Sequence, residues 1–358
     1  MHVVFAAGGT AGHLEPALTT ADALIALDSS TQVSFIGGSR GLERDLVAPR
    51  GFPLVQTQAQ PLPRKIGPAA AAFPFDTVGS IRQARAHLRS ARADVVVGFG
   101  GYAAIPGYLA AWTTRTPLII HEANSRAGFA NVLGAKLTPY VATVHPHAIG
   151  HARRMALPLR ASIAHLDRRA QRDAARAQWG VPADSPVLLV FGGSQGARRL
   201  NDAVAGSLAT LAEHGVTVIH VVGKNNELPP ERPGYHPVPY VDRMDLAYAA
   251  ADLAVCRSGA MTCAELTAVG LPAIYVPLPI GNGEQAGNSR PIVEAGGGLQ
   301  CLDQDMTAEW LTSTVPPLVH DEVRLREMSL SAASLGDRHA DRELAKWIEE
   351  VAGQRRKG

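Results

Sequence analysis

The chain has 358 residues, of which 46% are hydrophobic and 18% charged. This composition excludes a disordered chain, and the length fits two domains better than one ordinary core. The sequence contains no apolar stretch near the ~20 residues that a membrane-spanning helix needs. The net charge of +2 is unevenly distributed. Residues 1–160 hold 15 Lys or Arg and 8 Asp or Glu, whereas residues 161–358 hold 19 Lys or Arg and 24 Asp or Glu. We therefore expect the first part to face an anionic partner.

The cysteines and the start of the chain bear on the compartment. Cys256, Cys263 and Cys301 form neither a CxxC pair nor an even-numbered framework, which is typical of a reduced cytosolic protein with buried thiols. Met1 is followed directly by a strand pattern, so we expect no signal peptide.

Strand-like apolar runs alternate with helical patterns along the chain. After the first run, 2–7, a helical stripe with i, i+3, i+4 spacing comprises Leu14, Ala17, Leu18, Ala21, Leu24 and Ile25. Further strands are expected at 33–37, 95–98, 118–121, 187–191, 216–222, 253–256 and 273–276, and a last helix at 340–351. This βαβ rhythm predicts parallel sheets covered on both faces. From Ala152 to about Arg169 prolines and arginines, with no strand, indicate a linker.

Two strands run into glycine-rich turns that precede helices, at 8–13 (GGTAGH) and 192–196 (GGSQG). Such turns leave backbone N–H groups free at the positive end of a helix dipole, which suits phosphate. Neither turn is GxGxxG with an acidic residue about 20 positions on, and no GxxxxGK[ST] follows, so a dinucleotide site and ATP hydrolysis are not favoured. Each turn alone fits tight strand–helix packing as well as ligand binding.

Two polar segments in the second half make the pattern more specific. RSGAMTCAEL (257–266) follows a strand and opens a helix, and it places Glu265 two turns into that helix, where a carboxylate could accept hydrogen bonds from a ribose diol. GNGEQAGN (281–288) carries amide side chains suited to sugar hydroxyls.

Eight segments occur in an order that resembles the MurG family of peripheral membrane glycosyltransferases, over nearly the whole chain. They are GGTAGHLEPAL, GLERDLV, FGGYAAIPGYLAA, HEANSRAGFAN, LPLR, FGGSQGARRLN, RSGAMTCAEL and GNGEQAGN, the last in a form similar to an actinobacterial branch. The family transfers N-acetylglucosamine from UDP-GlcNAc to lipid I, giving lipid II for peptidoglycan synthesis.

The resemblance implies a GT-B glycosyltransferase fold, α/β, with two Rossmann-like domains whose parallel sheets face each other across a cleft. Residues 1–158 would form the acceptor and membrane domain, and residues 159–339 the UDP-sugar domain. The C-terminal helix, about 340–358, would pack back on the first domain.

The resemblance also implies the donor site. Ser194 and the amides around Gln195 and Gly196 would hold the UDP diphosphate without a metal or other cofactor, although a helix cap explains the same residues. Glu265 would bind the ribose, and Gln285 the sugar hydroxyls. The full set implied for UDP-GlcNAc is Thr10, Ala11, Gly12, Asn124, Arg160, Ser194, Gln195, Gly196, Val241, Met244, Ala260, Met261, Thr262, Glu265, Glu284 and Gln285. Core packing predicts the same residue types at the two uracil-pocket positions, 241 and 244.

The acceptor diphosphate is expected on the first glycine turn and its neighbour, at Gly8, Gly9, Gly100, Gly101 and Tyr102. His13 is the candidate general base, which would take the proton of the acceptor C4 hydroxyl as C1 of the α-linked donor is attacked with inversion. A positioned histidine typically contributes about 10²–10⁴-fold. The alternative is that His13 binds the acceptor diphosphate as a cation.

Residues 61–92 interleave basic and apolar side chains, as in segments that contact anionic lipid. The predicted membrane patch comprises Arg64, Lys65, Ile66, Phe73, Phe75, Val78, Ile81, Arg82, Arg85 and Arg89. A solvated helix face is the alternative, and no motif supports nucleic-acid binding. The predicted location is peripheral, on the cytoplasmic face of the cell membrane, with cell-division or cell-wall synthesis proteins as candidate partners besides UDP-GlcNAc and lipid I.

Three other functions stay open from the sequence. A related GT-B transferase could act on another lipid or natural product. A UDP-sugar epimerase would need further acidic and histidine residues and no basic, apolar patch. A non-enzymatic two-domain binding module is less well supported, since it does not explain two phosphate-type turns.

Overall fold

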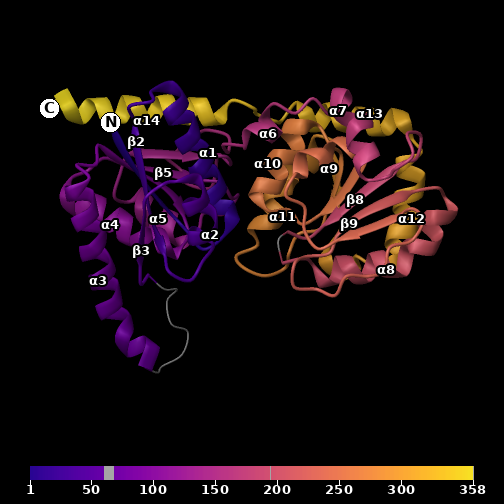
Figure 1. The fold of residues 1–358 in the computed structure, drawn as a ribbon, viewed down its shortest axis with the longest axis horizontal. Coiled ribbons are helices and arrows are strands. Elements are labelled where there is room, and N and C mark those ends of the chain that lie inside the picture. The colour runs from indigo at the N-terminus through magenta and orange to yellow at the C-terminus, as the bar shows by residue number, and fades with distance from the viewer. Residues whose placement is uncertain (60–67, 194, 358) are drawn as a thin grey trace. The chain divides into compact units, whose positions relative to one another are not determined.

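The computed structural model describes residues 1–59, 68–193 and 195–357, with the backbone alone at 68–74 and 355–357. The chain divides into two compact units, which are described separately: unit 1 is Met1–Arg160 with His339–Gly358, and unit 2 is Ala161–Arg338 (Figure 1). Four predicted site residues, Arg64, Lys65, Ile66 and Ser194, lie outside the described residues, as does the side chain of Phe73.

Unit 1 is built on a parallel sheet of seven strands in the order β3-β2-β1-β4-β5-β6-β7. The strands are β1 (His2–Ala7), β2 (Gln32–Gly38), β3 (Leu54–Thr57), β4 (Val95–Gly100), β5 (Leu118–Glu122), β6 (Tyr140–Thr143) and β7 (Arg153–Arg154). Successive side chains of β1 enter different cores, since Val3 and Phe5 face one side of the sheet and Val4 and Ala6 the other. Helices therefore have to cover both faces.

The helices of unit 1 are α1 (Ala11–Leu27), α2 (Glu43–Val47), α3 (Pro68–Ser90), α4 (Ile105–Thr114), α5 (Phe129–Ala135) and α14 (Ala340–Lys357), with 3-10 turns η1 (Ala48–Arg50) and η2 (Tyr102–Ala104). The predicted stripe of α1 is buried except for Ile25, which is half-buried, and it packs with α14 on one face of the sheet (Figure 1). Helices α3, α4 and α5 contribute to the core on the other face. The C-terminal helix is thus part of unit 1.

Unit 2 repeats this plan with a parallel sheet of six strands in the order β10-β9-β8-β11-β12-β13. The strands are β8 (Val187–Phe191), β9 (Thr217–Val221), β10 (Tyr235–Val238), β11 (Leu253–Cys256), β12 (Ala273–Tyr275) and β13 (Gly298–Gln300). The helices are α6 (Ala161–Ala164), α7 (Arg168–Gln178), α8 (Arg198–Glu213), α9 (Met244–Ala250), α10 (Ala260–Val269), α11 (Glu284–Glu294), α12 (Ala308–Val319) and α13 (Glu322–Ala333), with the 3-10 turn η3 (Asp303–Asp305). Helices α8 and α12 pack together on one face of the sheet (Figure 1).

Each predicted strand is present, but the expectation of no strand after Ala152 is wrong. Arg153 and Arg154 form β7, which pairs with Ala142 and Thr143 of β6 at the edge of the sheet. Both arginine side chains are exposed, because an edge strand is held by backbone hydrogen bonds and needs no apolar side chain. Among the described residues, no helix combines the length and the hydrophobicity that crossing a bilayer requires.

Candidate functional site

In both units the strand order reverses next to the first strand, between β1 and β4 in unit 1 and between β8 and β11 in unit 2. Ligands of open α/β sheets bind outside the carboxyl ends of the strands at such a switch point. Both predicted glycine turns follow these strands, as do the Gly100–Tyr102 segment and the Arg257–Thr262 segment. Each unit therefore carries these predicted segments at the position where open α/β sheets bind ligands.

In unit 1 the two glycine segments touch each other and His13. A side chain at Gly101 would overlap the carbonyl oxygen of Gly8 and come within 3.3 Å of His13 Nδ1. Gly101 also has a φ of 81°, in the left-handed region that favours glycine. The structure thus brings together Gly8, Gly101 and His13, which were predicted from segments far apart in the sequence.

A buried glutamate that the sequence did not single out holds the first glycine turn. Glu43, at the start of α2, is 1% exposed, and its Oε1 accepts hydrogen bonds from the backbone N–H groups of Gly9 at 3.0 Å and Gly38 at 2.8 Å. A charged acceptor roughly doubles the strength of such bonds. Glu43 therefore fixes the turn against the end of β2.

A second buried glutamate, Glu122 at the end of β5, organises the loop that carries Asn124. Its Oε1 accepts from the Asn124 backbone N–H at 2.8 Å and from its side-chain Nδ2 at 3.2 Å. Its Oε2 accepts from the Gly128 N–H at 3.0 Å and from Asn131 Nδ2 at 2.9 Å. These bonds satisfy several acceptor sites of the carboxylate, so the orientation of Asn124 is set by Glu122.

The network continues to the Gly100 segment. Asn131 Oδ1 accepts from the Tyr108 hydroxyl at 2.9 Å, and that hydroxyl oxygen accepts from the Gly100 N–H at 2.9 Å. Burial raises the pKa of Tyr108 well above its usual value, which keeps the phenol protonated as a donor. Glu122 and Gly100 are therefore linked through two side chains.

His13 is half-buried, and its contacts define which ring nitrogen can act as a base. Nδ1 lies 3.1 Å from the Gly8 carbonyl oxygen and 3.1 Å from Thr10 Oγ1. Because a carbonyl can only accept, we assign the proton of the neutral ring to Nδ1, which leaves Nε2 as the acceptor. Burial lowers the pKa of His13 below 6.5, and the charges of Glu122 and Glu43 and the Gly8 carbonyl offset part of that shift. The ring is thus neutral at neutral pH.

The other predicted residues of unit 1 differ in their exposure. Thr10 and Gly12 are exposed and Ala11 is half-buried. Tyr102, which is 42% exposed, stacks on Phe129 with a centroid distance of 6.4 Å. Arg160 is half-buried in the last segment of unit 1 before α6.

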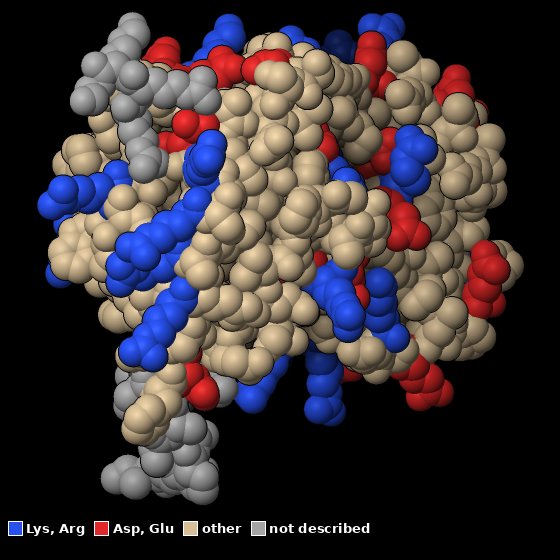
Figure 2. Space-filling model, turned by 60° about the vertical axis from the view of Figure 1, so that its left-hand side comes forward, with Lys and Arg blue, Asp and Glu red and all other residues tan. Residues whose placement is uncertain are grey.

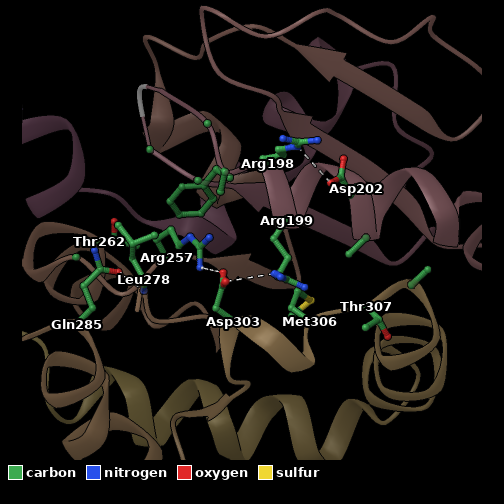
Figure 3. Close-up of a pocket in the computed structure, with 18 residues that line it drawn as sticks. Arg198, Arg199, Asp202, Arg257, Thr262, Leu278, Gln285, Asp303, Met306 and Thr307 are labelled. Atoms are coloured by element: carbon green, nitrogen blue, oxygen red, sulfur yellow. Dashed lines mark hydrogen bonds and ion pairs between the residues drawn. The ribbon is translucent and has the colours of Figure 1, made fainter. Parts of the chain in front are cut away.

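Unit 2 has a cavity of about 960 Å³ at its switch point (Figure 3). Of the predicted donor residues, Gly196, Thr262 and Gln285 line it, together with Gly192 and Gly193. Helices α8 and α10 begin beside it, at Arg198 and Ala260. Free N–H groups at two helix N-termini and a glycine turn suit a phosphate group.

Two asparagines from the loop after β9 hold the second glycine turn. Asn226 Nδ2 donates to the carbonyl oxygens of Gln195 and Val222, each at 3.0 Å. Asn225 Nδ2 donates to Gln195 Oε1 at 3.0 Å. Gly196, with a φ of 75°, packs so closely on the Val222 carbonyl that a side chain would overlap it.

Charged side chains that were not predicted as site residues also line the cavity. They are Arg198, Arg199, Asp202, Arg257 and Asp303. Figure 3 shows Arg257 and Arg199 converging on Asp303 from opposite sides. Arg257 lies in the quoted segment RSGAMTCAEL, directly after β11, so its position at the switch point could have identified it.

The remaining predicted donor residues are not among the described residues that line this cavity. Glu265 is 5% exposed and its Oε2 accepts from the Tyr248 hydroxyl at 2.8 Å. Val241 is buried, and Met244, which begins α9, is half-buried. Glu284 Oε2 accepts a hydrogen bond from the Asn282 N–H at 3.2 Å. Its neighbour Gln285, which does line the cavity, has an Oε1 that accepts from the Leu278 N–H at 3.0 Å. Ala260 and Met261, in the first turn of α10, are half-buried.

The described part of the predicted membrane patch lies on α3. Arg82 and Arg89 are exposed and Arg85 and Ile81 are half-buried. Phe75 is 80% exposed and Val78 47% exposed. Figure 2 shows Lys and Arg side chains gathered in a band on the side of unit 1 that carries α3.

Two Rossmann-like sheets in one chain, each with glycine segments at its switch point, form the architecture of the GT-B glycosyltransferases. Residues 3–143 match the glycosyltransferase family 28 N-terminal domain and residues 187–345 match the glycosyltransferase family 28 C-terminal domain. The chain belongs to glycosyltransferase family 28 and, within it, to the MurG family.

Named relatives support this assignment. The chain is 51% identical to the UDP-N-acetylglucosamine--N-acetylmuramyl-(pentapeptide) pyrophosphoryl-undecaprenol N-acetylglucosamine transferase of Thermobifida fusca, over 98% of this chain and 94% of the relative. It is 51% identical to the transferase of the same name from Mycobacterium sp. strain KMS, over 98% and 95%. The structure superposes on that of Acinetobacter baumannii MurG with a TM-score of 0.80 and 28% identity, covering 98% of this chain and 99% of that one.

A more distant likeness shows the fold alone. The calicheamicin glycosyltransferase CalG4 is 17% identical at a TM-score of 0.69, covering 98% of each chain. Among the described residues, no group of three or more His, Cys, Asp or Glu side chains could hold a metal ion.

Proposed function

We propose that this chain transfers N-acetylglucosamine from UDP-GlcNAc to the C4 hydroxyl of the N-acetylmuramyl group of undecaprenyl-diphospho-MurNAc-pentapeptide, lipid I. The products are lipid II and UDP, and the reaction inverts the configuration at C1 of the donor. The 51% identity of the chain to two transferases of this name, over 98% of its length, supports the proposal.

The observation that carries the chemistry is the orientation of His13. Its Nδ1 is engaged by the Gly8 carbonyl at 3.1 Å, so Nε2 is available to accept the proton of the acceptor hydroxyl. As that proton leaves, the oxygen forms a bond to C1 of the donor sugar, and the bond from C1 to the β-phosphate oxygen breaks. Its electron pair stays on UDP. The lowered pKa of His13 keeps the ring neutral, which favours the base role over the cation role.

The leaving group becomes more negative as that bond breaks, and the cavity of unit 2 offers groups that stabilise this charge. The N-termini of α8 and α10 supply backbone N–H groups, and Arg257 and Arg199 supply cations. Donors that are already in place stabilise developing charge strongly. We propose that these groups hold the diphosphate and that the transfer needs no metal ion.

The same framework assigns the other predicted residues. Glu265 would bind the ribose by exchanging its bond from Tyr248 for bonds from the ribose hydroxyls, and Gln285 would bind the sugar. The amides of Gly8, Gly9, Gly100 and Gly101 would hold the acceptor diphosphate. Glu43 and Glu122 are positioning residues for these segments. Glu43 accepts a hydrogen bond from the Gly9 N–H, and Glu122 is linked to Gly100 through Asn131 and Tyr108.

We propose that α3 places the protein on an anionic membrane surface, as a peripheral protein on the cytoplasmic face. Phe75 and Val78 are large apolar side chains exposed beside the arginines at 82, 85 and 89. Shallow insertion of the apolar groups and attraction of each cation, about 1 kcal/mol apiece, would act together.

The test of the reaction is UDP release from UDP-GlcNAc with and without a lipid I analogue, in the presence of EDTA. Wild type should release UDP only with the acceptor. His13→Ala should lower kcat by about 10²–10⁴-fold and leave UDP affinity within twofold. His147→Ala, at an exposed histidine of the same unit, is the matched control. Equal activity of His13→Ala and wild type would exclude the base role, and UDP release that does not depend on the lipid I analogue would exclude the proposed transfer.

A further inference from the structure

One carboxylate in the cavity of unit 2 joins two arginines from different elements (Figure 3). Asp303, in η3 after β13, has Oδ1 2.6 Å from Nη1 of Arg257 and Oδ2 3.2 Å from Nε of Arg199. Arg257 follows β11, and Arg199 lies in the first turn of α8. The three side chains thus form an ion triad at the point where we propose that the donor diphosphate binds.

The two arginines differ in how freely they can change partner. The Arg257 side chain is 12% exposed, and its Nη1 also donates a hydrogen bond to the Val276 carbonyl at 3.1 Å. The Arg199 side chain is 46% exposed. Arg257 is therefore held by the protein on two sides, whereas Arg199 can move toward a ligand without losing a backbone contact.

The hold of Asp303 on Arg257 is short but poorly aligned. Oδ1 is buried and has no hydrogen-bond partner within the described residues, even though Nη1 is 2.6 Å away. The aligned hydrogen bond of that nitrogen goes to Val276 instead. Since direction as well as distance decides the strength of a hydrogen bond, this carboxylate neutralises charge more than it locks geometry.

We infer that Asp303 is a displaceable counter-ion, which neutralises Arg257 and Arg199 while the cavity is empty and competes with the diphosphate of the donor for them. On binding, the phosphate oxygens would take over the arginine charge, mainly at the more mobile Arg199. No covalent bond changes in this exchange. The inference rests on the proposed binding of a UDP-sugar in this cavity and adds a positioning residue that limits the affinity for UDP.

Charge balance explains why such a counter-ion is useful. Among the described residues, three arginines and two helix N-termini surround the cavity, and Asp202 is the lining carboxylate besides Asp303. Asp202 lies 3.9 Å from Arg198, in a pair whose side chains are 94% exposed for the arginine and 73% for the aspartate. A pair so exposed is largely screened by water and salt. Asp303, whose side chain is 17% exposed, is thus the carboxylate that balances the cavity. Without it, the product UDP would be held more tightly.

The test compares UDP binding, by calorimetry at fixed ionic strength, in the full chain and in Asp303→Asn. Asparagine keeps the shape and removes the charge, so the Kd for UDP should fall by about fivefold, the size expected for one partly screened charge near a diphosphate. Steady-state kcat should fall with it if release of UDP limits turnover. Asp202→Asn removes the same charge from the exposed rim, and its effect should stay below about twofold.

Two further variants keep the inference testable if Asp303→Asn folds poorly. Asp303→Glu retains the charge and should retain the wild-type Kd. Arg199→Gln should weaken UDP binding by about threefold, because it removes the more mobile cation.

Each outcome has a distinct meaning. Tighter UDP binding by Asp303→Asn but not by Asp202→Asn supports the counter-ion role, which a merely structural role would not produce. Unchanged or weaker binding by Asp303→Asn, or unchanged binding by Arg199→Gln, overturns it. If wild type itself does not bind UDP, the proposed function is wrong. The role of Asp303 is then also wrong, because it requires a UDP-sugar in this cavity.

Discussion

Glu43 allows a quantitative test of how the first glycine turn is held. Replacing it with alanine removes the Oε1 acceptor of the Gly9 and Gly38 N–H groups, at 3.0 and 2.8 Å, from a site that is 1% exposed. Hydrogen bonds to a charged group contribute about 1.5–3 kcal/mol each, so the loss of both bonds in Glu43→Ala should lower the free energy of unfolding of unit 1 by about 3–6 kcal/mol. The turn should also lose its fixed shape.

Glu43→Gln separates geometry from charge. Its Oε1 can still accept from both N–H groups, so we expect a loss of only about 1–2 kcal/mol. The control is Asp45→Ala, an exposed acidic residue of the same short helix. Its effect should stay below about 1 kcal/mol, the usual limit for a charge at a helix N-terminus.

The assay combines urea unfolding with hydrogen exchange of peptides that cover residues 8–13 and 37–43. Glu43→Ala should speed exchange in both peptides and raise the KM for the lipid acceptor more than that for UDP-GlcNAc. If Glu43→Ala matches Asp45→Ala in stability and in exchange of these peptides, the buried glutamate does not hold the turn, and the reasoning is wrong.

Three further predictions concern pH and charge. The pKa of His13 is lowered from 6.5, and a general base must be unprotonated, so kcat/KM should fall at acid pH with an apparent pKa below 6.5. Glu43→Gln removes a charge that raises the pKa of His13, so it should lower this apparent pKa further. An apparent pKa above 6.5 for the fall at acid pH would contradict the base role of His13. Burial lowers the pKa of His121 and of His220 to about 4, so the unfolded chain binds more protons than the folded chain below about pH 6.5. The free energy of unfolding of each unit should therefore fall by about 2 kcal/mol as the pH is lowered from about 6.5 to about 5. In urea titrations, His121→Gln should abolish this loss in unit 1, and His220→Gln should abolish it in unit 2. Replacing both Arg85 and Arg89 with Glu should abolish sedimentation with anionic vesicles and leave UDP binding unchanged. The control, Arg326→Glu at an exposed site in unit 2, should change neither property. Unchanged sedimentation of the double variant would exclude the proposed membrane patch.

The parallel sheets could be predicted because buried strands are continuous apolar runs. β1, β8 and β11 are such runs, and the buried stripe of α1 is visible in its spacing. Edge strands give no such signal: β13 has three residues, β10 contains Pro237, and β7 is two exposed arginines. Their pairing depends on backbone hydrogen bonds to a neighbour that only the folded sheet provides.

The parts of the candidate site that come from one short segment could be predicted from the sequence. The contacts between residues that lie far apart in the chain could not. The first glycine turn and His13 lie in one segment. Glu43 acts on Gly9, which lies 34 positions earlier in the chain, and Glu122 acts on Asn131, which comes nine positions later. Asp303 faces Arg199 across more than a hundred residues. Such contacts follow from strand order, which places the ends of different βα units side by side.

The proposed transfer is tested most directly by isolating the product formed from UDP-GlcNAc and a lipid I analogue and determining its linkage by nuclear magnetic resonance. The expected product carries one N-acetylglucosamine in β-linkage on O4 of the N-acetylmuramyl group, with one UDP released for each sugar transferred. Free N-acetylglucosamine, an α-linkage or a sugar on another hydroxyl would contradict inverting transfer to lipid I.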